Sequence, residues 1–152
     1  MNLTVKVSGT DALALKFKYL IKAAQQGLKF GVAEAADLIA EEAKTLVPVD
    51  TGYLHDHIHV ETVTDSPERQ VAVVSPVNEA ANDYGFDPAY ARRIEFGFIG
   101  TDRLGRTYHQ AASPFMRPAY DAKKEEATAA IKEGVFSALD DAMNQVAARR
   151  RG

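Results

Sequence analysis

A stripe of apolar residues at helical spacing runs through residues 11–46, and no other feature restricts the fold of this chain as strongly. Its members recur every three or four positions and include Leu13, Phe17, Leu20, Leu28, Val32, Ile39 and Leu46. The Thr10–Asp11 pair favours a helix start, since a hydroxyl caps free N–H groups and a carboxylate stabilises the first turn. Pro48 ends the helix because it lacks an N–H. Gly27 and Gly31 are weak points at which the helix can bend or break.

A second stripe follows Pro118 and closes with three arginines at 149–151, whose charges suit a helix C-terminus. Its members include Tyr120, Ala127, Ile131, Val135, Leu139 and Val146. As helices, residues 11–46 would span about 54 Å and residues 119–148 about 45 Å, whereas a compact domain of this size is only about 40 Å across. Either the first helix breaks near Gly27, or helix ends project beyond the core. Projecting apolar stripes need a covering surface, so the helix lengths indicate assembly.

Strand-like segments alternate polar and apolar residues at Leu3–Val7, His57–Thr64 and Gln70–Ser75, and a less regular one spans Tyr90–Phe96. The turn residues Ser66-Pro67-Glu68 predict that the second and third of these segments pair antiparallel. The polar stretches 78–88 and 97–114 are predicted to be loops. We therefore expect one α+β domain over residues 1–152. It would hold a small antiparallel sheet of three to four strands packed against long N-terminal and C-terminal helices, with a loop at about 97–113 and the last helix beginning at about 118.

Composition excludes several classes of protein. The chain has 152 residues, a formal net charge of −3 and no cysteine. The charge gives no reason to expect tight binding to nucleic acid or anionic membranes, and disulfides and cysteine-ligated zinc are excluded. No run of about 18 apolar residues is present, so we expect a soluble protein made in the cytoplasm.

The triplet Asp50-Thr51-Gly52 is the signature of aspartic proteases, in which two aspartates share a proton. Only one copy is present, it follows a long helix, and the bulky Tyr53 comes next. We therefore favour a turn between helix and strand, in which Asp50 bonds nearby N–H groups and Gly52 adopts a conformation that other residues avoid.

Three histidines, His55, His57 and His59, would share one face of a strand, because strand side chains alternate. Two histidines at this spacing can bind zinc, so a metal-dependent hydrolase is the alternative function. The remaining His109 lies far along the chain in a glycine-containing segment. We favour a polar, partly exposed strand face without a metal.

Three ordered motifs carry a family resemblance. They are Val47-Pro-Val-Asp-Thr-Gly-x-Leu54, Tyr90-Ala-x-x-Ile-Glu-Phe-Gly97 and Ser113-Pro-Phe-Met-Arg-Pro-Ala119. In this order and spacing they resemble the head–tail joining, or tail-completion, proteins of tailed double-stranded DNA phages. That family includes relatives of the lambda minor tail protein Z. The resemblance covers roughly residues 30–135.

The resemblance implies a structural virion protein of the neck, without catalysis, cofactor or metal. Copies would form a homo-oligomeric ring, with six-fold symmetry favoured over twelve-fold. The ring would lie between head-side adaptor or portal proteins and a tail terminator or tail tube protein, and DNA would pass through it without sequence-specific binding. A stand-alone binding module is a third hypothesis. The candidate structural or interface residues are Pro48, Asp50, Thr51, Gly52, Leu54, Tyr90, Glu95, Phe96, Gly97, Pro114, Phe115, Arg117 and Pro118.

The chemistry of the last two motifs suggests individual roles. Glu95 can cap or pair, Phe96 packs, and Gly97 lets the chain turn. The prolines at 114 and 118 bracket Phe115, and the second lies near the first turn of the last helix. Arg117 can pair with Glu95 or with Asp50. These residues can serve the fold of the monomer or a contact between subunits, and both interpretations stay open.

Overall fold

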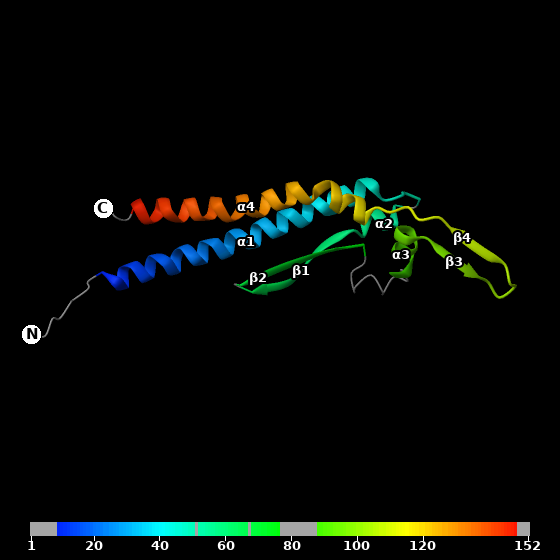
Figure 1. Ribbon diagram of the computed structural model, residues 1–152, viewed down its shortest axis with the longest axis horizontal. Coiled ribbons are helices and arrows are strands. Elements are labelled where there is room, and N and C mark those ends of the chain that lie inside the picture. Colours follow the sequence, from blue (N-terminus) through cyan, green and yellow to red (C-terminus); the bar gives the residue numbers. More distant parts are fainter. Residues whose placement is uncertain (1–8, 51, 67, 77–87, 149–152) are drawn as a thin grey trace, which may run out of the picture.

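The computed structural model describes residues 9–50, 52–66, 68–76 and 88–148. In chain order the elements are α1 (Thr10–Leu46), α2 (Tyr53–Asp56), β1 (His59–Ser66), β2 (Arg69–Ser75), α3 (Pro88–Phe96), β3 (Phe98–Thr101), β4 (Thr107–Gln110) and α4 (Met116–Ala148). Figure 1 shows α1 and α4 side by side and antiparallel, with α2, α3 and the β3–β4 hairpin gathered toward one end of the molecule. The predicted α+β class with long N-terminal and C-terminal helices is confirmed.

The strands form two separate antiparallel pairs instead of one sheet of three or four strands. β1 pairs with β2 from His59 opposite Ser75 to Ser66 opposite Arg69, and the pair packs against α1. This antiparallel pairing was predicted correctly. At its turn, the Arg69 N–H donates to Ser66 Oγ over 3.1 Å.

The second pair, β3 with β4, lies inside the segment 97–114 that was predicted to be a loop. The prediction was wrong because the glycines of this segment serve a hairpin. Gly97 precedes β3 and Gly105 lies in the turn, with φ angles of 75° and 76°. Positive φ is accessible to glycine at little cost, so both residues allow sharp changes of chain direction around short strands.

The segment 90–96 is helical, which corrects the strand predicted at Tyr90–Phe96. Ala91 and Ile94 lie three residues apart and are 5% and 7% exposed, so one helical face enters the core. The tyrosine, isoleucine and phenylalanine of this segment favour strands, but burial at helical spacing outweighs that preference. A proline at position 88 suits the first turn of a helix.

α1 continues without a break through Gly27 and Gly31, so the predicted weak points do not interrupt it. Packing against α4 explains why. A Cβ atom on Gly27 would lie 2.4 Å from the carbonyl oxygen of Gly134, and one on Gly31 would lie 2.7 Å from Cα of Ile131. The glycines allow the two backbones to approach closely, and this contact offsets their low helix propensity.

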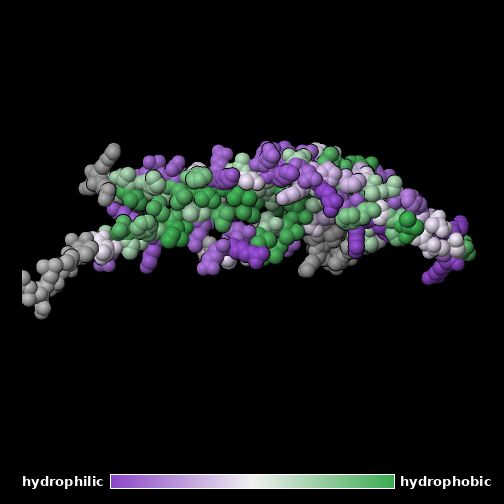
Figure 2. Space-filling model, in the orientation of Figure 1, coloured by the Kyte–Doolittle hydropathy of each residue, from purple (hydrophilic) through white to green (hydrophobic). Residues whose placement is uncertain are grey.

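The helix ends therefore project beyond the core. This was the second of the two alternatives that the helix lengths left open. With 37 and 33 residues, α1 and α4 are about 56 Å and 50 Å long. We call residues 10–31 of α1 together with residues 131–148 of α4 the two-helix arm. Figure 2 shows hydrophobic residues gathered along this arm on the face in view.

Both long helices begin slightly differently from the prediction. Gly9, with a φ of 90°, occupies the N-cap position of α1 without a side-chain cap bond, and Thr10 is already helical. α4 begins at Met116 instead of about residue 118. The predicted strand at 3–7, most of the predicted loop at 78–88 and the arginines at 149–151 lie outside the described residues.

A small hydrophobic core lies where α1 ends and α4 begins. Its buried members are Ala40, Ala43, Val47, Leu54, Ile58, Ala91, Ile94, Phe115 and Ala119. Phe115 is 0% exposed and is the largest side chain that is fully buried in the described part of the chain. None of the described helices is both long enough and apolar enough to cross a membrane.

Candidate assembly surfaces

The three sequence motifs meet at the core. Leu54 from the first motif, Ile94 from the second and Phe115 from the third are all buried in one cluster, and Tyr90 packs against it half-buried. The exposed members lie around this cluster: Pro48, Asp50, Phe96, Pro114, Arg117 and Pro118. Thr51 lies outside the described residues. The motifs therefore join the ends of the two long helices to the small elements.

Of the Asp50-Thr51-Gly52 triplet, the described residues Asp50 and Gly52 lie between α1 and α2, and not on a buried strand. Gly52 has a φ of 79° and occupies the N-cap position of α2, as its predicted turn role requires. Its carbonyl accepts the Asp56 N–H over 3.0 Å. Asp50 is exposed. This arrangement lacks the buried strand setting of a protease aspartate.

Glu95 connects the second motif to the third. One carboxylate oxygen accepts the N–H groups of Phe115 and Met116 over 2.8 Å and 3.0 Å, and the other accepts that of Arg117 over 3.2 Å. These are the free N–H groups at the start of α4, so Glu95 caps that helix from a distance in sequence. Desolvation alone would raise the pKa of Glu95, but these three bonds and the charge of Arg117 lower it below its ordinary value.

Other residues of these motifs depart from their expected roles. Phe96 was predicted to pack, yet it is 68% exposed at the end of α3. It borders an open groove of about 590 Å³ together with Met116, Arg117 and Tyr120. Glu95 was one of the two partners predicted for Arg117. The hydrogen bond between them is donated by the backbone N–H of Arg117.

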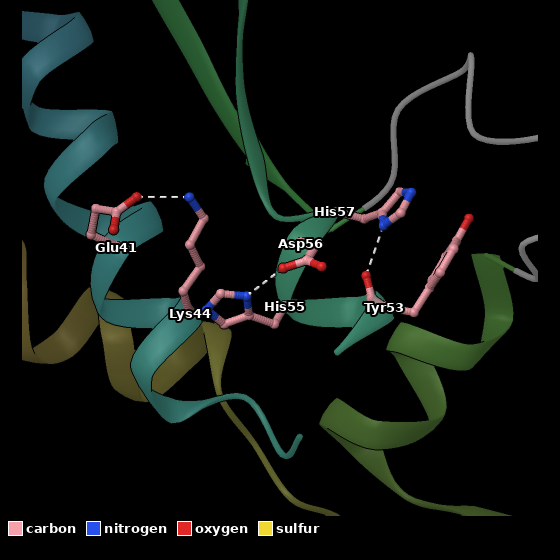
Figure 3. A network of polar contacts seen from close by, with 6 residues as sticks. All are labelled: Glu41, Lys44, Tyr53, His55, Asp56 and His57. Atoms are coloured by element: carbon pink, nitrogen blue, oxygen red, sulfur yellow. Dashed lines mark hydrogen bonds and ion pairs between the residues drawn. The ribbon is translucent and has the colours of Figure 1, made fainter. Parts of the chain in front are cut away.

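The three neighbouring histidines do not share a strand face. His55 belongs to α2 and His57 follows it (Figure 3), whereas His59 begins β1. His55 Nδ1 pairs with Asp56 at 2.8 Å, whereas Nδ1 of His57 bonds the carbonyl of Tyr53 at 2.7 Å.

The rings of His57 and Tyr53 stack with centroids 3.8 Å apart. His59 Nδ1 bonds the carbonyl of His57 at 3.0 Å. Within the described ranges, no group of three histidine, aspartate or glutamate side chains could hold a metal ion. The three histidines therefore do not form the strand face that the hydrolase alternative requires.

The two-helix arm exposes apolar side chains on more than one face. Leu13, Phe17 and Met143 are 54%, 57% and 55% exposed. They line a groove of about 560 Å³ together with Leu20 and Val146. Large apolar side chains at this exposure are typical of surfaces that bind another protein.

A different groove of the arm, of about 410 Å³, runs beside the glycine contact. Its lining includes Tyr19, Phe30, Gly134, Ser137 and Asp141. The Tyr19 hydroxyl donates to Gln145 Oε1 across this groove, and Phe30 is 69% exposed. This groove therefore combines aromatic side chains with a carboxylate.

The β3–β4 hairpin is the third exposed surface. Ile99, Leu104 and Tyr108 are 69%, 77% and 52% exposed, and among the described elements the strands pack extensively only against each other. Arg93 lies over the ring of Phe98, 5.5 Å from its centroid, at the base of the hairpin.

Sequence reasoning missed the residues that shape these surfaces. The four-residue spacing of Gly27 and Gly31 signals close helix packing, but it also fits a flexible point. The sequence Asp102-Arg-Leu-Gly105 is a turn signal that fits a hairpin as well as a loop. Nothing in the sequence identifies Gly134 as the partner of the first two glycines.

Comparison with known proteins supports a phage origin. Residues 11–97, more than half of the chain, match the sequence profile of the family described as "Bacteriophage HK97-gp10, putative tail-component". The match includes the first two motifs and covers α1, the β1–β2 pair and α3. No curated protein and no solved structure gives a significant match.

Proposed function

The chain belongs to the HK97 gp10-like family of phage tail components, and from this membership we propose that it is a structural subunit of the virion neck. In this role it joins the head to the tail and is related to the lambda minor tail protein Z. Its copies form a closed ring, with six subunits favoured over twelve. The neighbours of the ring are a head-side adaptor or portal protein and a tail terminator or tail tube protein.

One observation supports this proposal above the others: the two-helix arm leaves large apolar side chains uncovered over much of its length. A monomer in water gains nothing from exposing such a surface, whereas a subunit buries it on assembly. Cyclic oligomers form when one surface of a subunit binds a different surface of its neighbour and the rotation closes.

The charge of the chain is compatible with a channel for DNA. A formal net charge of −3 provides no strong attraction to phosphates. A ring that must let the genome pass is better served by weak contacts, because tight binding would slow the passage.

The experiment that tests this role uses a phage that encodes the chain. A stop codon early in its gene should yield filled heads and separate tails that do not join, and supplying the protein from a plasmid should restore whole particles. Electron microscopy of lysates provides the readout. Normal attachment of heads to tails without the protein would contradict a joining role, and complete absence of tails would place the protein in tail assembly instead.

A further inference from the structure

The β3–β4 hairpin is stabilised at its tip by one carboxylate. Asp102 accepts the N–H groups of Leu104 and Arg106, both over 2.9 Å, and also bonds Arg106 Nε at 2.7 Å and the Tyr108 hydroxyl at 3.1 Å. The Gly105 N–H donates to the Asp102 carbonyl over 3.1 Å. An isolated two-stranded hairpin is only marginally stable in water. This network holds the tip in one conformation, which lowers the entropic cost of binding.

The ordered tip carries both apolar and positive groups. Asp102 forms an ion pair with Arg106, whereas the guanidinium of Arg103 has no ion pair with any described residue. Leu104 beside it is 77% exposed. The tip therefore presents an uncompensated cation next to an exposed leucine.

The groove beside the glycine contact carries a negative charge, whereas the hairpin tip carries a positive one. Asp141 is its single charged lining residue among those described, and its carboxylate has no ion pair within the described ranges. The aromatic side chains of Tyr19 and Phe30 line the same groove as this carboxylate. A groove with aromatic side chains and one carboxylate suits a leucine and an arginine.

We propose that the hairpin tip of one copy binds this groove on the arm of a second copy, with Arg103 facing Asp141 and Leu104 packing near Phe30. Figure 1 shows the hairpin at one end of the molecule and the helix ends of the arm at the other, so one chain cannot make this contact with itself. The contact joins two different surfaces, which is the type that generates rings. This inference rests on the proposed ring and names the surfaces that build it.

Charge reversal tests the contact directly. Arg103→Glu and Asp141→Arg should each raise the dissociation constant of self-assembly about tenfold or more, because like charges would face each other. The double variant should assemble nearly as well as the unchanged protein. Arg69→Glu and Glu125→Arg, at exposed positions outside both surfaces, serve as matched controls that should leave assembly unchanged. Single variants that assemble normally, or a double variant that is not restored, would overturn the inference.

Cysteine cross-linking identifies the geometry of the same contact. The chain has no cysteine of its own, so Leu104→Cys and Ser137→Cys each introduce a single exposed thiol. Under oxidation, a mixture of the two variants should form disulfide-linked dimers, and neither variant alone should do so. Dimers from one variant alone would show a contact between identical surfaces and would contradict the proposal.

The outcomes separate this inference from the proposed function. A chain that assembles into rings without the mixed cross-link overturns the hairpin contact and leaves the ring intact. A chain that stays monomeric overturns both. If the charge reversals spare self-assembly but prevent heads from joining tails, the groove binds another virion protein and the contact between copies is wrong.

Discussion

Glu95 illustrates how one side chain can join two distant parts of this fold. It lies on α3, and its carboxylate bonds three N–H groups at the start of α4. A carboxylate at this position also interacts favourably with the helix dipole. Capping was one of two roles that the sequence left open for Glu95, and the sequence did not identify α4 as the helix that it caps. The exposure of Phe96 was not predictable, because the sequence of this segment favours a strand whereas the structure has a helix that ends at this residue.

Replacing Glu95 with glutamine should destabilise the protein by about 1 kcal/mol, a modest effect because Glu95 is only partly buried. The amide keeps one acceptor oxygen but loses the charge and the second acceptor. Urea denaturation followed by circular dichroism measures the change. Glu133→Gln is a matched control on the exposed surface of α4 and should change the midpoint very little.

The same carboxylate predicts how stability depends on pH. Because the folded pKa of Glu95 lies below its ordinary value of 4.5, its contribution is present above that value and is lost as pH falls through the folded pKa. Denaturation midpoints measured from pH 5 downward should fall less steeply for Glu95→Gln than for the unchanged protein. Equal slopes would show that the carboxylate does not stabilise the start of α4.

At the scale of elements, the fold depends on a close contact between two long helices. The C-terminal limit of α1 was evident from the sequence, because the apolar stripe ends at Leu46 and Pro48 follows it. The effect of Gly27 and Gly31 on the fold was not evident. A glycine destabilises an isolated helix, but it stabilises the packing of two helices where their backbones approach too closely for a Cβ atom. Only the position of Gly134 on the other helix decides between these effects.

Gly27→Ala should therefore destabilise the protein by about 2 kcal/mol, although alanine favours helices by about 1 kcal/mol. The added Cβ would meet the carbonyl oxygen of Gly134 at 2.4 Å, and a backbone atom cannot move aside without displacing the helix. Thermal unfolding measures the loss. Lys22→Ala, at an exposed position on the same helix, is the control. A Gly27→Ala variant more stable than the unchanged protein would contradict the close contact.

The hairpin is a separate element whose order depends on Asp102. The pKa of Asp102 lies below its ordinary value, and the largest cause is the hydrogen bond from the backbone N–H of Arg106. Further bonds from the Arg106 side chain, from Leu104 and from Tyr108 also lower it. Asp102→Asn should accelerate amide hydrogen exchange in residues 98–110 about tenfold and leave the global unfolding midpoint nearly unchanged. Asp50→Asn is a control in another exposed turn. Equal exchange rates in both variants would show that the Asp102 carboxylate does not order the hairpin.

The secondary structure of two segments was predicted wrongly, and both errors have the same physical origin. In the segments 90–96 and 97–114, local composition gives weak and conflicting signals, and the tertiary environment decides the outcome. Burial of Ala91 and Ile94 on one side makes the first segment a helix. Bonds to Asp102 make part of the second a hairpin, and a short polar stretch with three glycines does not reveal that network in advance.

At the scale of the whole molecule, the chain is an elongated subunit with a small core. Two projecting helices leave apolar surface along the arm, and a hairpin extends at the opposite end (Figure 1). In the sequence, the lengths of the two helices are the feature that indicates assembly. The proposed pairing of hairpin and groove was not predictable, because residues 103 and 141 would meet only in a contact between two copies of the chain.

Native mass spectrometry of the purified chain tests the central claim most directly, since it counts subunits without labels. Six copies of the 16.6 kDa chain should give a closed species of about 100 kDa with no larger or open-ended series, as expected for a cyclic assembly. A spectrum that contains only the monomer, at every concentration and also in the presence of the neighbouring head and tail proteins, would contradict the account.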